Sequence, residues 1–311
     1  MVTPQLVATD ADAATPNTGA QASDWRDYFQ LLKPRVVALV VFTGAVGLIA
    51  APVHVHPLIA FVAILAIALG AGAAGALNQW YEADLDIRMK RTASRPVPAG
   101  RIGAKAAFDF AIVVAVAAVF LMQVAVGLFA AALLLASILF YVVIYTVWLK
   151  RRTPQNIVIG GAAGAFPPLI GWVAATGHIA PLPILLFAII FVWTPPHFWA
   201  LAMFVQKDYA NAGVPMLPLT HGNRETRRQI WLYSLALVAV TLAPIAIHAT
   251  GPLYAVLAVG LGAAFLWFAW GTYRNTADDP KQMKPEKRLF GYSILYLFFL
   301  FAGVAVDALI R

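Results

Sequence analysis

The sequence predicts an all-α membrane protein that crosses the bilayer nine times. Of its 311 residues, 61% are hydrophobic and only 12% are charged, which excludes an ordinary soluble domain. Nine apolar stretches are long enough to span the hydrocarbon core as helices. Lys and Arg concentrate in every second connection between these stretches, which is the pattern of a polytopic membrane protein.

The predicted spans follow one another with short connections, except after the second and the sixth. Those two connections cover about residues 78–103 and 205–228, and they carry most of the polar motifs described below. The nine spans are expected near residues 35–52, 57–77, 104–126, 128–149, 157–175, 182–204, 229–249, 252–272 and 289–309.

The distribution of positive charge predicts the orientation of the chain. The connections after spans two, four, six and eight are basic, and those after spans one, three, five and seven contain neither Lys nor Arg. The positive-inside rule therefore places the N-terminus and the long loops in the cytoplasm and the C-terminus outside. The net charge of +8 resides in short loops between spans, so it does not indicate a nucleic-acid partner.

The N-terminal segment differs from the rest in composition. Residues 1–24 are rich in Ala, Thr, Asp and Pro and lack an apolar run, which predicts a disordered tail rather than a signal peptide. The next residues, up to Pro34, are expected to form an amphipathic lead-in at the membrane surface, within a single domain over residues 25–311. The absence of cysteine excludes disulfides and thiolate chemistry.

An acidic motif follows the second span. Asn78, Glu82 and Asp86 recur every four residues and share one face if the segment is helical, whereas Asp84 points away. Two carboxylates and an amide form an oxygen-rich site of the kind that holds Mg²⁺ together with substrate phosphates. The alternative is a solvated helix end whose acids pair with nearby bases.

Basic residues follow this motif at once. The run from Arg88 to Arg101 includes Lys90, Arg91 and Arg95, which are suited to holding phosphate oxygens. A second run, Lys150-Arg151-Arg152, follows span four, where it either binds the same anion or serves only as a topogenic charge. Acids and bases together at the mouth of a membrane helix indicate diphosphate chemistry.

A further polar cluster lies at the end of the sixth span. His197 follows the tandem prolines 195–196 inside the apolar stretch, where a polar residue is costly unless it meets a partner or a cavity. It is either a packed histidine that bonds a backbone carbonyl or a ligand. Lys207 and Asp208 follow in the loop and are candidates for the second polar site.

These motifs resemble those of the intramembrane aromatic prenyltransferases, and within them the protohaem IX farnesyltransferases, over about residues 31–311. The acidic motif and the Arg-Pro-x-Pro-x-Gly run are shared across the superfamily. The Lys-Arg-Arg-Thr stretch at 150–153 with its Pro-Pro partner at 167–168, and the Pro-Pro-His-Phe-Trp run at 195–199, resemble the haem branch. The residues that carry the resemblance are Asn78-x-x-x-Glu82-x-x-x-Asp86, Met89-Lys90-Arg91-Thr92, Arg95-Pro96-Val97-Pro98-x-Gly100, Tyr145-Thr146 to Asn156, Gly160-Gly161-x-x-Gly164-x-x-Pro167-Pro168 and Trp193-Thr194-Pro195-Pro196-His197-Phe198-Trp199.

The resemblance implies a bundle of nine helices around a central cavity, capped by the two large cytoplasmic loops, in the bacterial inner membrane. It implies transfer of a farnesyl group from farnesyl diphosphate to a vinyl group of haem b, with haem O and diphosphate as products. The expected partners are these substrates, the lipid bilayer, and a downstream haem-modifying enzyme or terminal oxidase.

The resemblance also implies roles for the individual residues. Asn78, Glu82 and Asp86 are expected to hold Mg²⁺, with Asp208 as a further catalytic residue and His197 as a haem contact. Other branches carry a second aspartate four residues after the position of Asp208, where this chain has Ala212. The diphosphate is expected to contact Lys90, Arg91, Arg95, Lys150, Arg151, Arg152 and Lys207.

Two other functions fit parts of the sequence. A prenyltransferase that acts on an aromatic quinone precursor would share the diphosphate motifs. A secondary transporter would also have many spans and intramembrane polar residues, but its site belongs near the bilayer midplane. Here the polar residues gather at one face of the membrane.

Overall fold

The structure is a computed structural model that describes residues 24–310, in which every regular element is a helix. The predicted tail, apart from Asp24, lies outside the described residues. Four helices are short, namely α1 (Trp25–Leu31), α4 (Ala83–Asp86), α9 (Gln206–Ala212) and α10 (Leu217–Thr220). The long helices are α2 (Pro34–Ile49), α3 (Pro57–Tyr81), α5 (Ala104–Ala125), α6 (Leu128–Leu139) with its continuation η1 (Phe140–Leu149), α7 (Asn156–Thr176), α8 (Pro181–Phe204), α11 (Gly222–Ala246), α12 (Pro252–Arg274) and α13 (Lys284–Ile310).

The long helices confirm the predicted membrane spans. Within the described chain, eight helical segments are long and apolar enough to cross a bilayer, and α1 with α2 makes a ninth if this pair, bent by 52°, counts as one span. Trp25 and Phe29 of α1 are exposed, as expected for the predicted surface lead-in. Four of the helices begin with proline, whose missing N–H costs nothing at that position.

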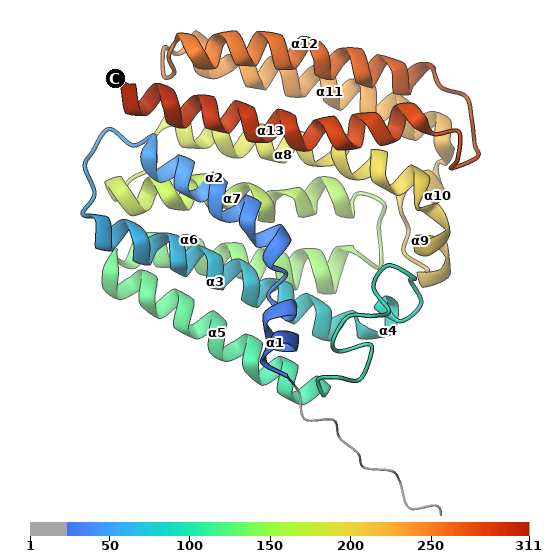
Figure 1. Ribbon diagram of the computed structural model, residues 1–311, viewed down its shortest axis with the longest axis horizontal. Helices are drawn as coiled ribbons and strands as arrows, with labels where there is room; N and C mark the ends of the chain where they lie inside the picture. Colours follow the sequence, from blue (N-terminus) through green and yellow to red (C-terminus); the bar gives the residue numbers. More distant parts are fainter. Residues whose placement is uncertain (1–23, 311) are drawn as a thin grey trace, which may run out of the picture.

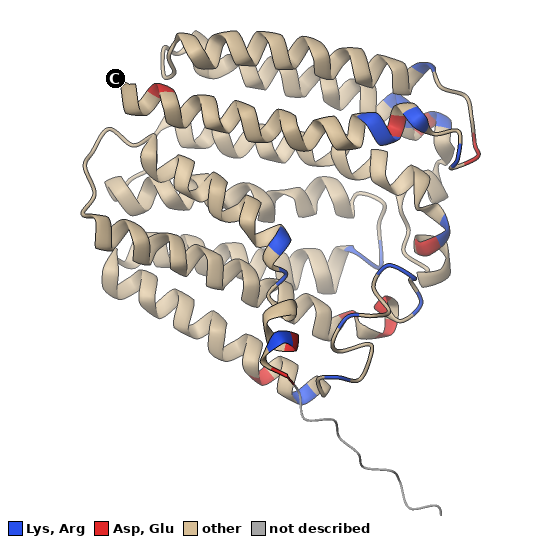
Figure 2. Cartoon of the chain, in the orientation of Figure 1, with Lys and Arg blue, Asp and Glu red and all other residues tan. Residues whose placement is uncertain are grey.

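The helices lie side by side, from α12 at one edge of the bundle to α5 at the other (Figure 1). α1 and the C-terminus of α13 lie at opposite ends of the bundle, as an odd number of crossings requires. Most Lys, Arg, Asp and Glu residues occur at the end of the bundle that carries α1, α4 and α9 (Figure 2). The charge asymmetry in the sequence therefore corresponds to two chemically different ends of the bundle.

The α2 and α7 helices pack unusually closely at the centre of the bundle. A Cβ atom at Gly47 would lie 2.0 Å from the carbonyl oxygen of Pro168, and one at Gly171 would lie 2.0 Å from that of Gly44. Only glycine lets the two backbones approach this closely, which is how small residues join membrane helices. The crossing fixes the path of α2, and with it the position of Lys33 just before α2 begins.

The fourth span changes from an α-helix to a π-helix halfway through. In η1, the backbone N–H of Lys150 donates to the carbonyl oxygen of Tyr145 at 3.0 Å, and the Thr146 hydroxyl donates to that of Tyr141 at 2.9 Å, both five residues back. Gly160 on α7 makes room for Tyr145, since a Cβ there would lie 2.2 Å from the tyrosine ring. π-helical turns are rare and often occur at functional sites.

A buried ion pair joins two spans at the charged end. The Arg227 guanidinium on α11 donates to Glu286 Oε1 on α13 at 2.9 Å, and both side chains are almost completely buried. The same guanidinium donates to the carbonyl oxygen of Ala277 at 2.5 Å, and Asn275 donates to Glu286. These bonds fix the connection between α12 and α13 to the rest of the bundle.

Three predicted helix ends are corrected by the structure. The α3 helix continues to Tyr81, α11 starts at Gly222, and α13 starts at Lys284, each several residues beyond the predicted apolar span. Hydropathy marks only the part of a helix inside the hydrocarbon core, whereas backbone hydrogen bonds continue into the polar surface layer. The acidic motif therefore begins inside a helix.

Candidate active site

A cavity of about 560 Å³ opens inside the bundle. Its wall is formed by residues of α2, α3, α6, η1, α7, α8 and α13, together with parts of both large loops. Within the described chain, α5, α11 and α12 contribute no residue to it. One end of the cavity is polar, with Lys33, Asn78, Asp86, Arg95 and Lys150, and much of the remaining wall is apolar.

Asn78 and Asp86 of the acidic motif line the polar end of the cavity, whereas Glu82 is not part of its wall. The motif is not one continuous helix. The α3 helix ends at Tyr81, Glu82 caps it with φ of −99° and ψ of 13°, and Asp86 belongs to α4. The i to i−4 backbone bonds persist across the break, from Glu82 to Asn78 at 3.0 Å and from Asp86 to Glu82 at 2.8 Å. The predicted spacing therefore survives the break between the two helices.

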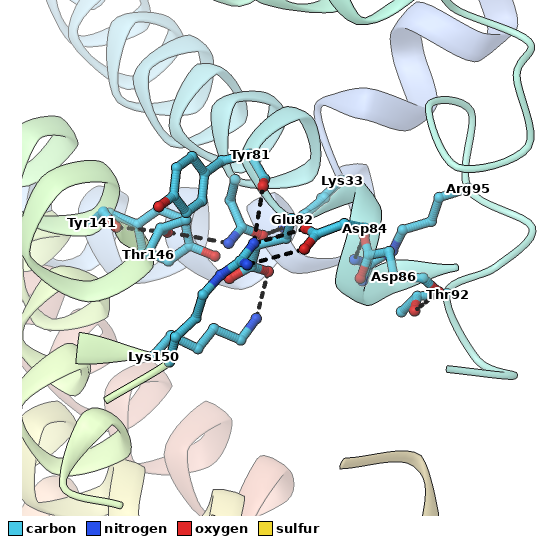
Figure 3. A network of polar contacts seen from close by, with 12 residues as sticks. Lys33, Tyr81, Glu82, Asp84, Asp86, Thr92, Arg95, Tyr141, Thr146 and Lys150 are labelled. Atoms are coloured by element: carbon cyan, nitrogen blue, oxygen red, sulfur yellow. Dashed lines mark hydrogen bonds and ion pairs between the residues drawn. The ribbon is translucent and has the colours of Figure 1, made fainter. Parts of the chain in front are cut away.

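All three residues of the motif are buried and bonded to other segments. Figure 3 shows Glu82 and Asp86 with their partners Lys150 and Arg95. Asn78 Nδ2 donates to Thr146 Oγ1 of η1 at 3.1 Å. Lys150 Nζ lies 2.5 Å from Glu82 Oε2, and the Arg95 guanidinium lies 2.7 Å from Asp86 Oδ2. These pairs join α3 and α4 to the loops that follow spans two and four.

Each carboxylate also keeps one unused oxygen. Glu82 Oε1 and Asp86 Oδ1 are buried and have no hydrogen-bond partner among the described residues. A buried carboxylate oxygen without a partner is costly unless a cation or a donor completes it. Two such oxygens on neighbouring turns have the chemistry of ligands for a hard divalent cation such as Mg²⁺. The described residues contain no cluster of three or more His, Cys, Asp or Glu side chains, so a cation here also needs amide or phosphate oxygens.

Lys33 is a member of this site that the sequence analysis did not single out. It lies in the break between α1 and α2 with a left-handed backbone, at a φ of 52°, and its Nζ donates to Asn78 Oδ1 at 2.7 Å. Burial, together with the nearby positive charge of Arg95, lowers the pKa of Lys33 to about 7. An anion bound beside these cations would oppose that shift.

Only some of the predicted anion-binding residues line the cavity. Arg91, Arg95 and Lys150 line the cavity, and their contact with a diphosphate stays a prediction. Lys90 and Arg152 are exposed and are not part of the cavity wall.

Arg151 points away from the cavity. It makes a two-pronged ion pair with Asp84, at 2.7 Å and 3.0 Å, and both side chains are substantially exposed. This bond to Arg151 lowers the pKa of Asp84. The pair joins the two loops on the outside of the site, so in the described structure Arg151 is a loop contact.

The second large loop contributes residues other than those predicted. Tyr209 and Met216 line the cavity, whereas Lys207 is exposed and Asp208 is not part of the wall. Both are on α9, whose buried positions are Tyr209 and Ala212. The predicted roles of Lys207 and Asp208 stay predictions.

His197 lines the same cavity from α8. Its ring is stacked between Trp193, at 4.3 Å between ring centroids, and Phe290 of α13, at 4.7 Å. Nδ1 lies 2.7 Å from the Ser293 hydroxyl oxygen. One of the two predicted roles was a packed histidine that bonds a backbone carbonyl. In the structure His197 instead bonds the side chain of Ser293, which is on another span.

Asn156 and the tyrosines of η1 also line the cavity. Asn156 is completely buried, and its Oδ1 has no partner among the described residues. The Tyr141 and Tyr145 rings lie 5.3 Å apart between centroids and are tilted by 38°, and Lys150 Nζ lies 5.8 Å from the centre of the Tyr145 ring. The π-helical register could not be predicted from an apolar run, so the sequence indicated Tyr145 and Asn156 only as parts of motifs and did not indicate Tyr141.

Comparison with known proteins agrees with this arrangement. The UbiA prenyltransferase family model matches residues 38–304. The chain is 58% identical to the Protoheme IX farnesyltransferase of Rhizorhabdus wittichii, over 96% of this chain and 98% of that one. It is 56% identical to the protein of the same name from Erythrobacter litoralis, over 95% of each chain.

Solved structures share the fold at low sequence identity. A digeranylgeranylglyceryl phosphate synthase superposes with a TM-score of 0.76 at 16% identity, over 92% of this chain and 99% of that one. A UbiA homologue from Archaeoglobus fulgidus, bound to GPP and Mg²⁺, superposes with a TM-score of 0.61 at 14% identity, over 89% and 99%. The family match and the 58% identical relative show that the chain belongs to the UbiA prenyltransferase family, and the helical fold and the polar end of the cavity agree with this.

Proposed function

We propose that the protein transfers a farnesyl group from farnesyl diphosphate to a vinyl group of haem b. The observation that carries the proposal is that one cavity combines an acid–base end suited to a diphosphate with an apolar wall that contains His197. The relatives with 58% and 56% identity bear the name Protoheme IX farnesyltransferase, which supports haem rather than a quinone precursor as acceptor.

The diphosphate end of the substrate is held at the mouth of the cavity. Lys33, Arg95 and Lys150 provide positive charge there, and Arg91 lies in the same wall. Diphosphate leaves only if its growing negative charge is compensated, so these side chains favour cleavage of the bond between carbon 1 of the prenyl chain and oxygen. Lys90, Arg151, Arg152 and Lys207 would contact the anion only after the loops move.

Asn78, Glu82 and Asp86 are proposed to hold Mg²⁺ with the diphosphate oxygens. The unpaired oxygens of Glu82 and Asp86 support this assignment, as does the Archaeoglobus fulgidus structure with Mg²⁺. Bound Mg²⁺ would neutralise charge on the leaving diphosphate. Asp208 is proposed to join the site when the substrate closes the second loop.

The apolar part of the cavity protects the reacting carbon. Loss of diphosphate leaves an allylic cation, which water would consume unless the wall excludes it. The vinyl group of haem b supplies the electron pair for the new carbon–carbon bond. Water then adds to the resulting cation and releases a proton, so the products are haem O, diphosphate and a proton.

The orientation of the protein in the membrane is proposed from the distribution of its charged residues. The end with α4, α9 and the diphosphate site is assigned to the cytoplasm of a bacterial inner membrane, with the N-terminus there and the C-terminus outside. Haem O would leave to a haem-modifying enzyme or a terminal oxidase.

The test is a product assay with the purified protein in lipid nanodiscs. Supplied with haem b, farnesyl diphosphate and Mg²⁺, it should form a haem heavier by one farnesyl group plus one hydroxyl group, detected by chromatography and mass spectrometry. EDTA should abolish this product. Prenylation of an aromatic acid without any modified haem would overturn the proposal and indicate the quinone-precursor reaction.

A further inference from the structure

The hydrogen bonds around His197 define which of its nitrogens carries the proton. The Ser293 hydroxyl lies 2.7 Å from the carbonyl oxygen of Phe290, which can only accept, so Ser293 donates its proton there. The same oxygen lies 2.7 Å from His197 Nδ1 and therefore accepts from it. The neutral ring then carries its proton on Nδ1 and a lone pair on Nε2.

The ring is also fixed in orientation. Trp193 and Phe290 stack on its two faces, and Trp193 Nε1 donates to the Ser293 carbonyl oxygen at 2.8 Å. Ser293 thus joins α8 to α13 through both its hydroxyl and its backbone. No bond to Nε2 occurs within the described residues, and His197 lines the cavity. The fixed ring presents a lone pair rather than an N–H group to a ligand there.

The lone pair on Nε2 distinguishes two ways in which haem could contact His197, through a propionate or through the iron. A propionate is a carboxylate, which accepts hydrogen bonds and has no proton to donate to Nε2. Haem iron is a Lewis acid, and neutral imidazole is a common ligand for it. Metal-ligating histidines typically donate their other N–H to an oxygen that fixes the tautomer, as Ser293 does here.

We propose that His197 Nε2 ligates the iron of the acceptor haem, and that Ser293 is the positioning residue that fixes its tautomer and orientation. The inference rests on the proposed function, because it assumes that haem occupies the cavity. His197 lies seven residues before the end of α8, about 10 Å along the helix from its charged end. Ligation there would hold the haem inside the bundle, on the apolar side of the diphosphate site.

The experiment is a titration of the purified, full-length protein with ferric haem b, followed by absorption and electron paramagnetic resonance spectra. The wild type should show a histidine-ligated spectrum. His197→Ala and His197→Gln should both lose that spectrum and bind haem at least tenfold more weakly. Imidazole added to His197→Gly should restore it. His178→Ala, an exposed histidine at the opposite end of the bundle, is the matched control and should behave as wild type.

Ser293 is tested separately, because its effect passes through the histidine. Ser293→Ala should weaken haem binding by about tenfold, within the range typical for partners of metal ligands, and shift the spectrum. Ser293→Thr, which keeps the hydroxyl, should restore both.

Two results would overturn the inference. An unchanged spectrum and affinity in His197→Ala would remove His197 from the haem site. Retained affinity in His197→Gln with a spectrum equal to wild type would instead indicate a propionate contact. The product assay above uses unmodified protein, so failure to farnesylate haem there refutes the proposed function and is distinguishable from either result.

Discussion

Replacement of Lys33 by methionine tests whether the break between α1 and α2 contributes to diphosphate binding. Methionine keeps most of the length and the apolar stem but removes the ammonium group, and both residues meet the same steric limits in the left-handed conformation at this position. Lys33 Nζ lies 2.7 Å from Asn78 Oδ1, inside the acidic motif. The substitution therefore removes one cation from the centre of the site.

The expected effect follows from the strength of a charged hydrogen bond. Such bonds contribute about 1.5–3 kcal/mol. Since about 1.4 kcal/mol corresponds to a factor of ten in rate, kcat/KM for farnesyl diphosphate should fall by about 10- to 150-fold. KM for haem should change little, because the lysine lies at the diphosphate end of the cavity.

The assay is steady-state formation of the modified haem at varied farnesyl diphosphate, with size-exclusion profiles to confirm an intact fold. Lys105→Met is the matched control, because Lys105 is exposed and, among the described residues, pairs only with the exposed Asp109 on its own helix. A kcat/KM for Lys33→Met within twofold of the wild type would refute the assignment of Lys33 to the site.

Three further predictions concern stability and the metal. Gly47→Ala should destabilise the bundle by about 1–3 kcal/mol, because the new methyl group would lie 2.0 Å from a carbonyl oxygen of α7. Thermal unfolding in detergent measures this change. The control is Gly260→Ala, which has open space around it and should match the wild type. Arg227→Ala should cost about 3–5 kcal/mol because it leaves Glu286 buried without its cation; an unchanged unfolding midpoint would contradict the importance of this pair. Asp86→Ala should abolish turnover at any Mg²⁺ concentration and leave the protein folded in membranes; normal activity in this variant would end the Mg²⁺ assignment.

The sequence determined the parts of this protein that depend on local patterns. Span positions follow from apolar length, and the charged end follows from where Lys and Arg occur, because both depend on the bilayer rather than on helix partners. The helical spacing of Asn78, Glu82 and Asp86 holds in the backbone bonds even where α3 gives way to α4, but only Asn78 and Asp86 line the cavity. The motifs of the haem branch likewise agree with the names of the 58% and 56% identical relatives.

The tertiary structure decided which of the candidate residues meet. Lys33 contacts Asn78 across 45 residues and His197 contacts Ser293 across 96, so neither pair is visible in any local pattern. Arg151 and Lys150 are neighbours in sequence, yet one faces Asp84 outside and the other Glu82 inside. Which way a side chain points depends on how helices cross and where they break. The crossings are set by close contacts such as the one between Gly47 of α2 and Pro168 of α7.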